Sequence, residues 1–388
     1  MKIVHLSLDS SYNDNWGYQD NLLPKYQKKL GHNVVVITTN TVQNNGKIET
    51  VPCSRYFLDD GEEIIRLDYK NVGLYPFRLL RKKFDIYALL EEIKPDFIFS
   101  HGLLNYSFLQ VIKYKKNINP NCIVVQDNHL DYNIGWRVNT LNDFIIRSYY
   151  RLLNRKTQKY VSKVYGVTPW RKKYAEDYFK INPKLTDVLI MGADDDFLKF
   201  DDKDKIRNEI RKKYDVKDIE FLIVTGGKID SKKKIDLLIQ SCADLNNVKL
   251  LIFGSISDEY QVYFNNLLKE KSNIIYIGWI ASKEVYNYFF AADLVIFPGQ
   301  HSVLWEQACA SKVPCVFAKW EGMDHVDNGG NSELIDEITV NALSKKIEEL
   351  LFTNKYFLMK EKAESSITNV YLYSNIAKKS LECAEKYD

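Results

Sequence analysis

The chain has 388 residues, of which 45% are hydrophobic and 27% charged, so it can bury cores and shows no bias toward disorder. Its 54 basic and 51 acidic residues nearly cancel, which argues against nucleic acid as a partner. The length exceeds what one hydrophobic core usually serves, and we therefore expect two domains.

The six cysteines are scattered without CxxC spacing, which predicts reduced, buried thiols rather than disulfides or a zinc framework. The segment MKIVHLSLDSS has a short apolar run interrupted by His5, unlike a signal peptide. No stretch reaches the ~18 uninterrupted apolar residues that spanning a bilayer requires. These features predict a soluble, cytoplasmic protein, and peripheral docking at the inner face of the cell membrane stays open.

Short β-branched runs alternate with longer helical patterns in the first half. The runs predict strands at residues 2–8, 33–39, 96–101, 122–127 and 163–168. A helix from Gln19 to Leu30 fits between the first two, ended by Gly31 as a left-handed cap. Such continuous apolar strands are covered by helices on both faces, which predicts an α/β, doubly wound, mostly parallel sheet.

The second half repeats this pattern, with strands expected at 221–227, 249–255, 273–279, 293–299 and 314–318. A linker near 191–201 would divide the chain into domains 1–192 and 193–369, and a terminal helix at about 370–388 would join the first domain. The dense charge run that follows the linker is typical of a solvated helix face.

Two loops of the second half carry candidate phosphate-binding chemistry. The loop after FLIVT reads GGKIDSKKK, which combines a glycine turn with cations, although a solvated basic loop explains it equally well. The second segment is FPGQHSVLWEQACASKVPCVFA, in which a glycine turn precedes an apolar helix containing Glu306. In open α/β sheets such loops, at the carboxyl ends of strands, are where ligands bind.

The spacing of GKIDSKKKIDLL resembles the G-R-L-x-x-x-K-G-x-x-x-L pattern of retaining glycosyltransferases of the GT-B fold, in family 4 (glycosyl transferases group 1). The second segment resembles the same family's strand, glycine turn and Glu-Ala helix, and YIGWIASKEVYNYFFAADLVIFP resembles the run between them. The resemblance implies two Rossmann-like doubly wound domains facing each other across a cleft. The N-terminal domain would bind the acceptor, and the C-terminal domain the nucleotide sugar.

By this resemblance Lys228 and Lys233 clamp the donor diphosphate, and Glu306 accepts hydrogen bonds from the ribose hydroxyls. Lys228 departs from the family Arg, because Lys cannot make a bidentate contact. Pro298 stands where the family has a second Glu that contacts the sugar, and Gln300 or His301 are candidate substitutes. The implied donor-binding set is Gly17, Gly227, Lys228, Lys233, Gly254, Trp279, Ile280, Gly299, His301, Ser302, Val303 and Glu306.

In the first half, His129 follows the fourth predicted strand and matches the family His that reaches the transferred sugar. With Lys228 and Lys233 it completes the predicted catalytic set, although a lone histidine is more often structural. His101 occupies a similar place after its strand. The aromatic residues Trp16, Tyr18, Tyr132 and Trp136 are suited to saccharide stacking.

The resemblance implies transfer of a sugar from a nucleotide-diphosphate donor to a hydroxyl of a saccharide or lipid-linked saccharide acceptor, in bacterial surface polysaccharide or glycoconjugate synthesis. It implies retention, no cofactor and no metal, and the acidic triplet Asp194 to Asp196 is interpreted as part of the linker. A sugar-nucleotide 2-epimerase and a non-catalytic nucleotide-sugar-binding homologue remain alternatives. A Rossmann dehydrogenase is disfavoured, since no GxGxxG follows a predicted strand.

Overall fold

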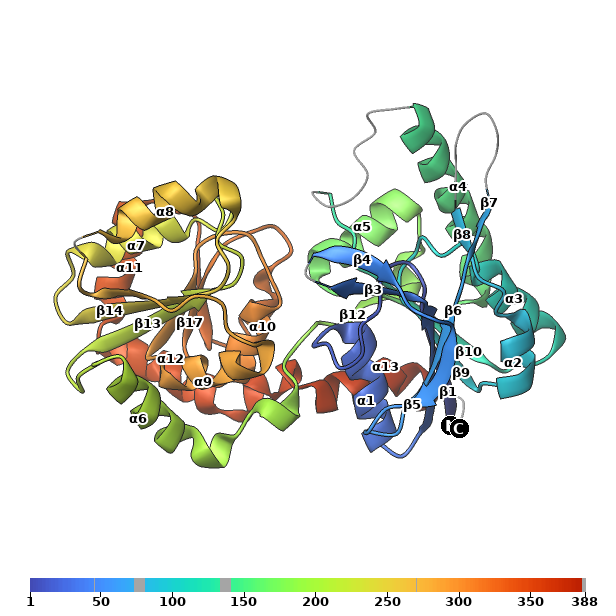
Figure 1. Cartoon of the computed structure of the whole chain (residues 1–388), viewed down its shortest axis with the longest axis horizontal. Coiled ribbons are helices and arrows are strands. Elements are labelled where there is room, and N and C mark those ends of the chain that lie inside the picture. The colour runs from blue at the N-terminus through green and yellow to red at the C-terminus, as the bar shows by residue number, and fades with distance from the viewer. Residues whose placement is uncertain (45, 73–80, 133–140, 270, 386–388) are drawn as a thin grey trace. The chain divides into compact units, whose positions relative to one another are not determined.

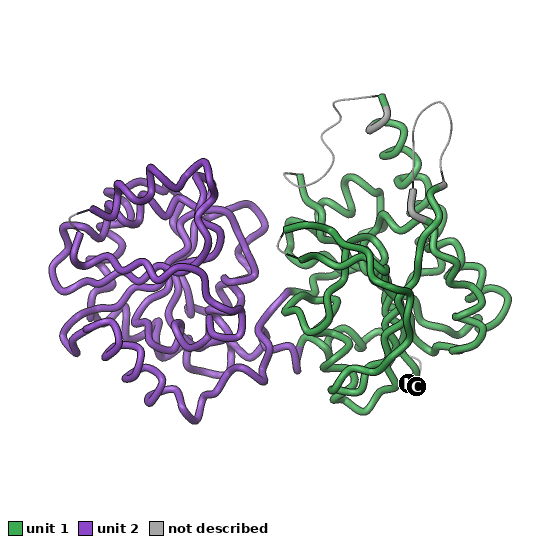
Figure 2. Tube along the Cα trace, in the orientation of Figure 1, with its two compact units in different colours: residues 1–190, 376–388 green, residues 191–375 purple. Residues whose placement is uncertain are grey.

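The computed structural model describes the whole chain except residues 45, 73–80, 133–140, 270 and 386–388. Both halves are α/β (Figure 1). The chain separates by internal contacts into unit 1, Met1–Ile190 with Ile376–Asp388, and unit 2, Met191–Asn375 (Figure 2). The sequence-based boundaries were placed at 192 and about 370, next to these.

Unit 1 contains a sheet of eight described strands in the order β12-β11-β10-β9-β1-β2-β6-β5, parallel except for the antiparallel edge strand β5. The pairs β3–β4 and β7–β8 form separate antiparallel ribbons. The five predicted strands are present within one or two residues, whereas the short and edge strands were not predicted. The bounds are β1 Lys2–Ser7, β2 Asn33–Thr39, β3 Thr41–Asn44, β4 Lys47–Thr50, β5 Ser54–Phe57, β6 Glu63–Leu67, β7 Lys70–Val72, β8 Arg81–Lys83, β9 Phe97–Ser100, β10 Ile123–Asn128, β11 Lys163–Gly166 and β12 Thr186–Val188.

Helices cover both faces of the unit 1 sheet (Figure 1). Along β1, Val4 and Leu6 belong to a core shared with residues of α2 and α3, whereas His5 points the other way and contacts α1. This alternation follows from the two-residue period of a strand. The helices are α1 Gln19–Lys29, α2 Tyr87–Ile93, α3 Phe108–Asn117, α4 Leu141–Thr157, α5 Pro169–Phe179 and α13 Tyr373–Glu385.

Unit 2 holds a six-stranded parallel sheet in the order β15-β14-β13-β16-β17-β18. The five predicted strands are confirmed, and β18 is an addition. The strands are β13 Phe221–Gly226, β14 Val248–Phe253, β15 Ile274–Tyr276, β16 Leu294–Phe297, β17 Cys315–Ala318 and β18 Ser332–Ile335. The helices are α6 Lys203–Lys213, α7 Ile235–Ala243, α8 Gln261–Leu268, α9 Val285–Ala291, α10 Leu304–Ala310, α11 Val340–Leu350 and α12 Asn354–Glu364.

The charge run in α6 is not simply a solvated face, which corrects the sequence-based interpretation. Arg211 is 5% exposed, and its NH1 lies 3.0 Å from the Oδ2 atom of Asp293, while NH2 of Arg207 lies 2.6 Å from Oδ1. The same carboxylate accepts a hydrogen bond from the backbone N–H of Leu222 on β13. Two arginines one helical turn apart thereby hold α6 against the sheet.

The expectation of buried thiols holds for four of the six cysteines, Cys122, Cys242, Cys309 and Cys315. It is wrong for Cys53, which is exposed, and Cys383 is partly buried. Cys53 lies between two edge strands that the sequence pattern did not reveal. Among the described residues, no helix combines the length and the apolar composition needed to cross a bilayer.

We expect Asp293→Ala to lower the free energy of unfolding by about 3–5 kcal/mol, because it leaves a buried arginine without its counter-charge. The matched control is Asp336→Ala, which breaks a pair with Lys319 whose two side chains are 78% and 55% exposed. An exposed pair contributes about 0–1 kcal/mol. Urea unfolding of both variants compares the two losses, and equal losses would contradict the structural role given to Asp293.

Candidate functional site

The carboxyl ends of β13 and β14 approach each other so closely that glycine is required. A Cβ on Gly254, whose φ is +126°, would lie 1.8 Å from the backbone oxygen of Gly227. Gly227 has φ +105°, and its N–H donates to the carbonyl of Phe253 at 3.0 Å. Both residues were predicted for the donor site, and the structure brings their turns together. This arrangement brings two backbone turns together at the sheet edge where ligands of such folds bind.

The basic loop and the second motif, almost seventy residues apart in sequence, meet at Lys233. A Cβ on Gly299 would lie 2.3 Å from the carbonyl carbon of Lys233, so these two backbones are in direct contact. The Lys233 ammonium donates to the carbonyl oxygens of Gln300 at 2.7 Å and His301 at 3.3 Å. Burial lowers the pKa of Lys233, an effect that the carboxylate of Asp230 partly opposes. The lysine is therefore held by the turn that precedes α10.

Glu306 is fully buried on α10 and lies between two histidines. The Nε2 atoms of His301 and His325 each lie 2.8 Å from the same oxygen, Oε1. Because an ionised carboxylate only accepts hydrogen bonds, both rings must carry a proton on Nε2. Burial alone would raise the pKa of Glu306, but the two histidines have the larger combined effect and lower it. The pKa of Glu306 therefore lies well below its ordinary value.

The second carboxylate oxygen of Glu306, Oε2, is buried and has no hydrogen-bond partner among the described residues. The Nδ1 atom of His325 is in the same condition. An unsatisfied buried acceptor costs about 1–3 kcal/mol, more when it is charged, and commonly marks the position of a ligand or water. The arrangement therefore leaves one of the two carboxylate oxygens without a hydrogen-bond partner among the described residues.

The other predicted donor residues of unit 2 lie in two places, the turn before α10 and the segment after β15. Ser302 and Val303 provide the carbonyls that accept the first hydrogen bonds of α10, from Trp305 and Gln307. Trp279 is 72% exposed and Ile280 is partly buried in the segment after β15, next to Gly278, whose carbonyl accepts from Gly254 N–H at 2.7 Å.

Lys228 differs from Lys233 in its surroundings. Its side chain is 69% exposed, and its ammonium lies 3.8 Å from Oδ2 of Asp230. The other oxygen of Asp230 accepts the backbone N–H groups of Lys232 and Lys233. Lys228 is therefore linked to Lys233 indirectly, through the side chain of Asp230. Its role as half of a diphosphate clamp stays a prediction.

Unit 1 brings together a second carboxylate and histidine cluster at the carboxyl ends of β9 and β10. Asp127 is fully buried, and its Oδ2 lies 2.7 Å from Nδ1 of His101 and 3.3 Å from Nε2 of His129. Its other oxygen accepts the N–H of Gly102 at 2.7 Å. The side chain of His129 is 42% exposed, so it is the member of the cluster that a ligand can reach.

A buried chain of hydrogen bonds fixes the charge of His101. Ser380 on α13 accepts from Nε2 of Gln27, which turns the Gln27 carbonyl oxygen toward Nε2 of His5, 2.8 Å away. His5 must donate there, so its Nδ1 is left to accept from Nε2 of His101, 3.1 Å away. With Nδ1 donating to Asp127, His101 carries both protons and is a cation.

The pKa directions agree with this assignment. Burial, with the nearby charge of His101, lowers the pKa of His5 to about 3. Burial would also lower the pKa of His101, but Asp127 outweighs it and raises that pKa above the ordinary 6.5. Asp127 has its pKa lowered by the two histidines against the opposing effect of burial. Asp127 and His101 thus form a buried ion pair whose charges cancel, and His129 contacts the carboxylate of this pair.

Gly17, in the same unit, has open space where a Cβ would stand, so nothing in the fold requires glycine there. Trp16 contacts Tyr18 edge to face, and Tyr132 packs on Trp170, whereas Trp136 lies outside the described residues. The acidic triplet is a cap: Asp194 accepts the N–H of Asp196, and Asp195 accepts that of Ser374.

Within the described part of the chain, two clusters each have ligand atoms close enough to hold a metal ion: His101, Asp127 and His129 in unit 1, and His301, Glu306 and His325 in unit 2. Neither cluster was predicted as a metal site, and nothing in the sequence pattern indicated a role for His325. His325 lies in DHVDNGGN, a turn after β17 with no helical or strand periodicity. Its position beside Glu306 depends on the return of the chain after β17, which no local pattern specifies.

Comparison with known proteins agrees with the fold and with unit 2. Residues 206–369 match the family "Glycosyl transferases group 1". An uncharacterised glycosyltransferase of Methanocaldococcus jannaschii is 24% identical over 261 residues, 64% of this chain and 60% of that protein. An uncharacterised 41.2 kDa protein in the cps region of Klebsiella pneumoniae is 24% identical over 191 residues, 42% of this chain and 51% of that protein. The chain thus spans half to three fifths of the length of these curated relatives.

Among solved structures, HepE of Anabaena in complex with UDP superposes with a TM-score of 0.68 at 15% identity, covering 100% of both chains. At this identity the likeness establishes the fold, which is GT-B with two Rossmann-like domains. The family match identifies residues 206–369 as a glycosyltransferase domain. The predicted GT-B fold is therefore confirmed, and residues 206–369 match the family that the sequence motifs resemble.

We expect Gly254→Ala to destabilise the protein by about 1–3 kcal/mol more than Gly278→Ala, because the first places a methyl group inside a backbone contact. Gly278 has φ +78° and open space around a Cβ, so its variant carries the strain of the backbone angle without a clash. Urea midpoints of the two variants test this difference. Equal midpoints would mean that the β13 and β14 turns are not in contact.

We expect the free energy of unfolding to fall as the pH drops through about 4.5, the ordinary pKa of Glu, because unfolded Glu306 then binds a proton that folded Glu306 does not. A lowered folded pKa means that the stabilisation is present above this pH and lost below it. Glu306→Gln should make the decline from pH 6 to pH 3 shallower, measured by urea unfolding. The exposed Glu337→Gln is the control, and an unchanged slope in Glu306→Gln would refute the assignment.

Proposed function

We propose that this chain, whose residues 206–369 are a glycosyl transferases group 1 domain on a GT-B fold, is a retaining glycosyltransferase that uses a nucleotide-diphosphate sugar. The observation that carries the proposal is the continuous contact from Lys233 through His301 to Glu306. It joins the two sequence motifs that resemble the donor site of this family. A cation for phosphate and a carboxylate for hydroxyl groups then lie in one cluster.

Lys233 supplies the positive charge for the donor phosphates. Two of its three ammonium N–H groups are used by the carbonyls of Gln300 and His301, and the third has no partner among the described residues. When the bond between the sugar and the diphosphate breaks, negative charge grows on the leaving oxygen. A fixed ammonium group at that point stabilises the transition state more than the bound substrate.

Glu306 supplies an acceptor for a ribose hydroxyl. The histidines His301 and His325 occupy Oε1 and keep the carboxylate ionised, and a hydroxyl that donates to Oε2 would complete its hydrogen bonding. His301 follows Pro298, which stands in the place of the family's second Glu. We propose that its contact with Glu306 supports the ribose acceptor rather than replacing the missing sugar contact.

In unit 1, we assign contact with the transferred sugar to His129. The buried ion pair of Asp127 and His101 holds a carboxylate oxygen 3.3 Å from its Nε2, and the exposed part of the ring remains available. In the proposed reaction the anomeric carbon exchanges its bond to the diphosphate oxygen for a bond to the acceptor oxygen, with retention. As that bond forms, the proton of the acceptor hydroxyl passes to the departing diphosphate oxygen, which balances the step.

The biological setting proposed is synthesis of a bacterial surface polysaccharide or glycoconjugate, in the cytoplasm at the inner face of the membrane. The acceptor would be a saccharide or a lipid-linked saccharide. Support comes from the relative in the cps region of Klebsiella pneumoniae. For the donor, support comes from the UDP complex of a protein with the same fold.

We expect UDP, GDP or ADP, or one of their sugars, to raise the melting temperature of the protein, because a ligand of the native state stabilises it. Lys233→Ala should weaken this binding by about ten- to a hundredfold, the loss of a charged hydrogen bond worth about 1.5–3 kcal/mol. Lys232→Ala removes the exposed neighbouring lysine and is the matched control. No shift with any nucleotide, or equal losses in both variants, would overturn the donor site.

We expect transfer activity to persist in EDTA, because Lys233 provides the charge that a metal supplies elsewhere. Loss of activity in EDTA with recovery on adding Mn²⁺ or Mg²⁺ would refute metal independence. The two histidine clusters would then be the candidate metal sites. The same assay without acceptor separates the epimerase alternative, since that enzyme would convert the donor sugar to its epimer. A nucleotide-induced shift without any turnover would favour the non-catalytic alternative.

A further inference from the structure

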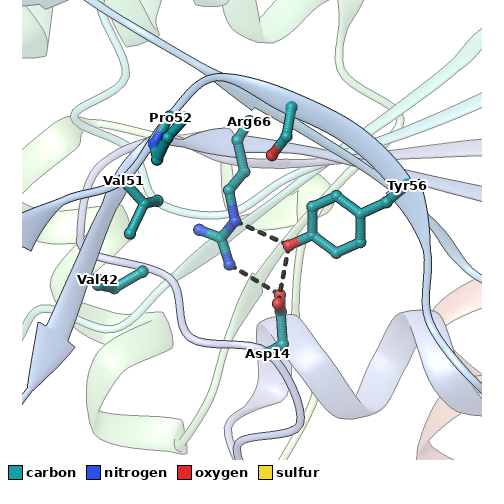
Figure 3. Close-up of a pocket in the computed structure, with 7 residues that line it drawn as sticks. Asp14, Val42, Val51, Pro52, Tyr56 and Arg66 are labelled. Atoms are coloured by element: carbon teal, nitrogen blue, oxygen red, sulfur yellow. Dashed lines mark hydrogen bonds and ion pairs between the residues drawn. The ribbon is translucent and has the colours of Figure 1, made fainter.

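A cavity of about 370 Å³ lies in unit 1, away from the histidine cluster described above. Arg66 on β6 and Asp14, in the loop after β1, form its polar side with Tyr56 on the edge strand β5 (Figure 3). Strand β3, the segment after β4 and the first residue of β5 supply the rest of its wall. The lining residues are Asp14, Val42, Val51, Pro52, Ser54, Tyr56 and Arg66.

The cavity is formed at the carboxyl ends of parallel strands, where open α/β sheets bind ligands. β1 and β2 run parallel and end at Ser7 and Thr39, and β6 runs parallel to β2 and ends at Leu67. Its volume lies near the lower end of the roughly 300–1,000 Å³ that small-molecule sites occupy, so it is sized for a small ligand.

The arginine in the cavity is not available to clamp an anion. Arg66 is 5% exposed, and its NH2 lies 2.8 Å from Oδ1 of Asp14, so the two charges cancel. Its remaining donors serve the hydroxyl of Tyr56 and the backbone carbonyls of Tyr12 and Thr39. A phosphate or carboxylate ligand would have to displace these bonds and would meet the carboxylate of Asp14.

Hydrogen-bonding capacity nevertheless remains on the polar side. Each oxygen of Asp14 receives one hydrogen bond, from Arg66 and from Tyr56, although a carboxylate oxygen can accept two. The side chain of Asp14 is 32% exposed, so a ligand can reach it. The hydroxyl of Ser54 is exposed and has no hydrogen-bond partner among the described residues.

Val42, Val51 and Pro52 face these groups as an apolar wall (Figure 3). The cavity therefore combines an apolar surface, acceptors for hydroxyl groups and no net charge. A sugar ring has the matching properties, because its C–H face is apolar and its hydroxyls donate from the rim. We propose that this cavity binds one neutral saccharide ring, and that the ring is a unit of the acceptor; the second part rests on the proposed function.

The test is ligand-observed NMR with methyl glycosides of glucose, galactose, mannose and N-acetylglucosamine. At least one should bind to the wild-type chain. Ser54→Trp fills the cavity from the exposed edge strand, opposite Arg66 on β6, without removing either member of the ion pair, and should weaken that binding by about tenfold or more. Val51→Ala, which removes part of the apolar wall, should weaken it as well. The control is Ile48→Trp, at a 73% exposed position of β4 that does not line the cavity.

Absence of binding by every glycoside, or binding that Ser54→Trp leaves unchanged, would overturn the proposal. Inorganic phosphate is the competing probe, and phosphate binding that Ser54→Trp abolishes would overturn the neutral-ring assignment. The nucleotide melting shift is measured on the same samples. If glycosides bind and no nucleotide does, the saccharide site stands while the proposed transfer reaction fails.

Discussion

A carboxylate can be buried in a protein only if hydrogen bonds and opposite charges replace the water that it loses, and this requirement organises both units. Asp293 is held by two arginines of α6, Asp127 by His101, His129 and the Gly102 amide, and Glu306 by His301 and His325. Each carboxylate ties together segments that are distant in the sequence. The first stabilises unit 2, and the other two stand at the carboxyl edges of the sheets, where chemistry is expected.

The hydrogen bonding around Glu306 is incomplete, and the proposed ribose contact rests on this. One oxygen receives two hydrogen bonds and the other receives none from the described residues. A carboxylate held in this way stays ionised while presenting a single acceptor, which is suited to a hydroxyl donor. Lys233 reaches the same turn through the carbonyl of His301, so cation and carboxylate share one support. Movement of that turn would displace both groups together.

Unit 1 contains two carboxylates whose charge is neutralised by a neighbouring cation, and the two sites differ in the groups that they present. The chain from Ser380 through Gln27 and His5 leaves His101 as a cation, which neutralises Asp127 beneath the exposed ring of His129. In the cavity, Arg66 and Asp14 neutralise each other, and the remaining acceptors face an apolar wall. One site therefore offers a histidine next to a fixed charge, and the other offers a neutral surface for hydroxyl groups.

The sequence by itself determined the α/β class, ten strands, and the first and last helices. These follow from local periodicity, which each segment carries alone. Lys233 and Glu306 were indicated by the resemblance of two segments to a known family. It did not determine the short edge strands, the burial of Arg211, or the partnership of His325 with Glu306 and of His101 with His5. Those depend on which segments fold back against one another, because the free energy of a buried charge is set by neighbours distant in the chain. The tertiary structure alone decided which oxygen of Glu306 is left without a hydrogen-bond partner among the described residues.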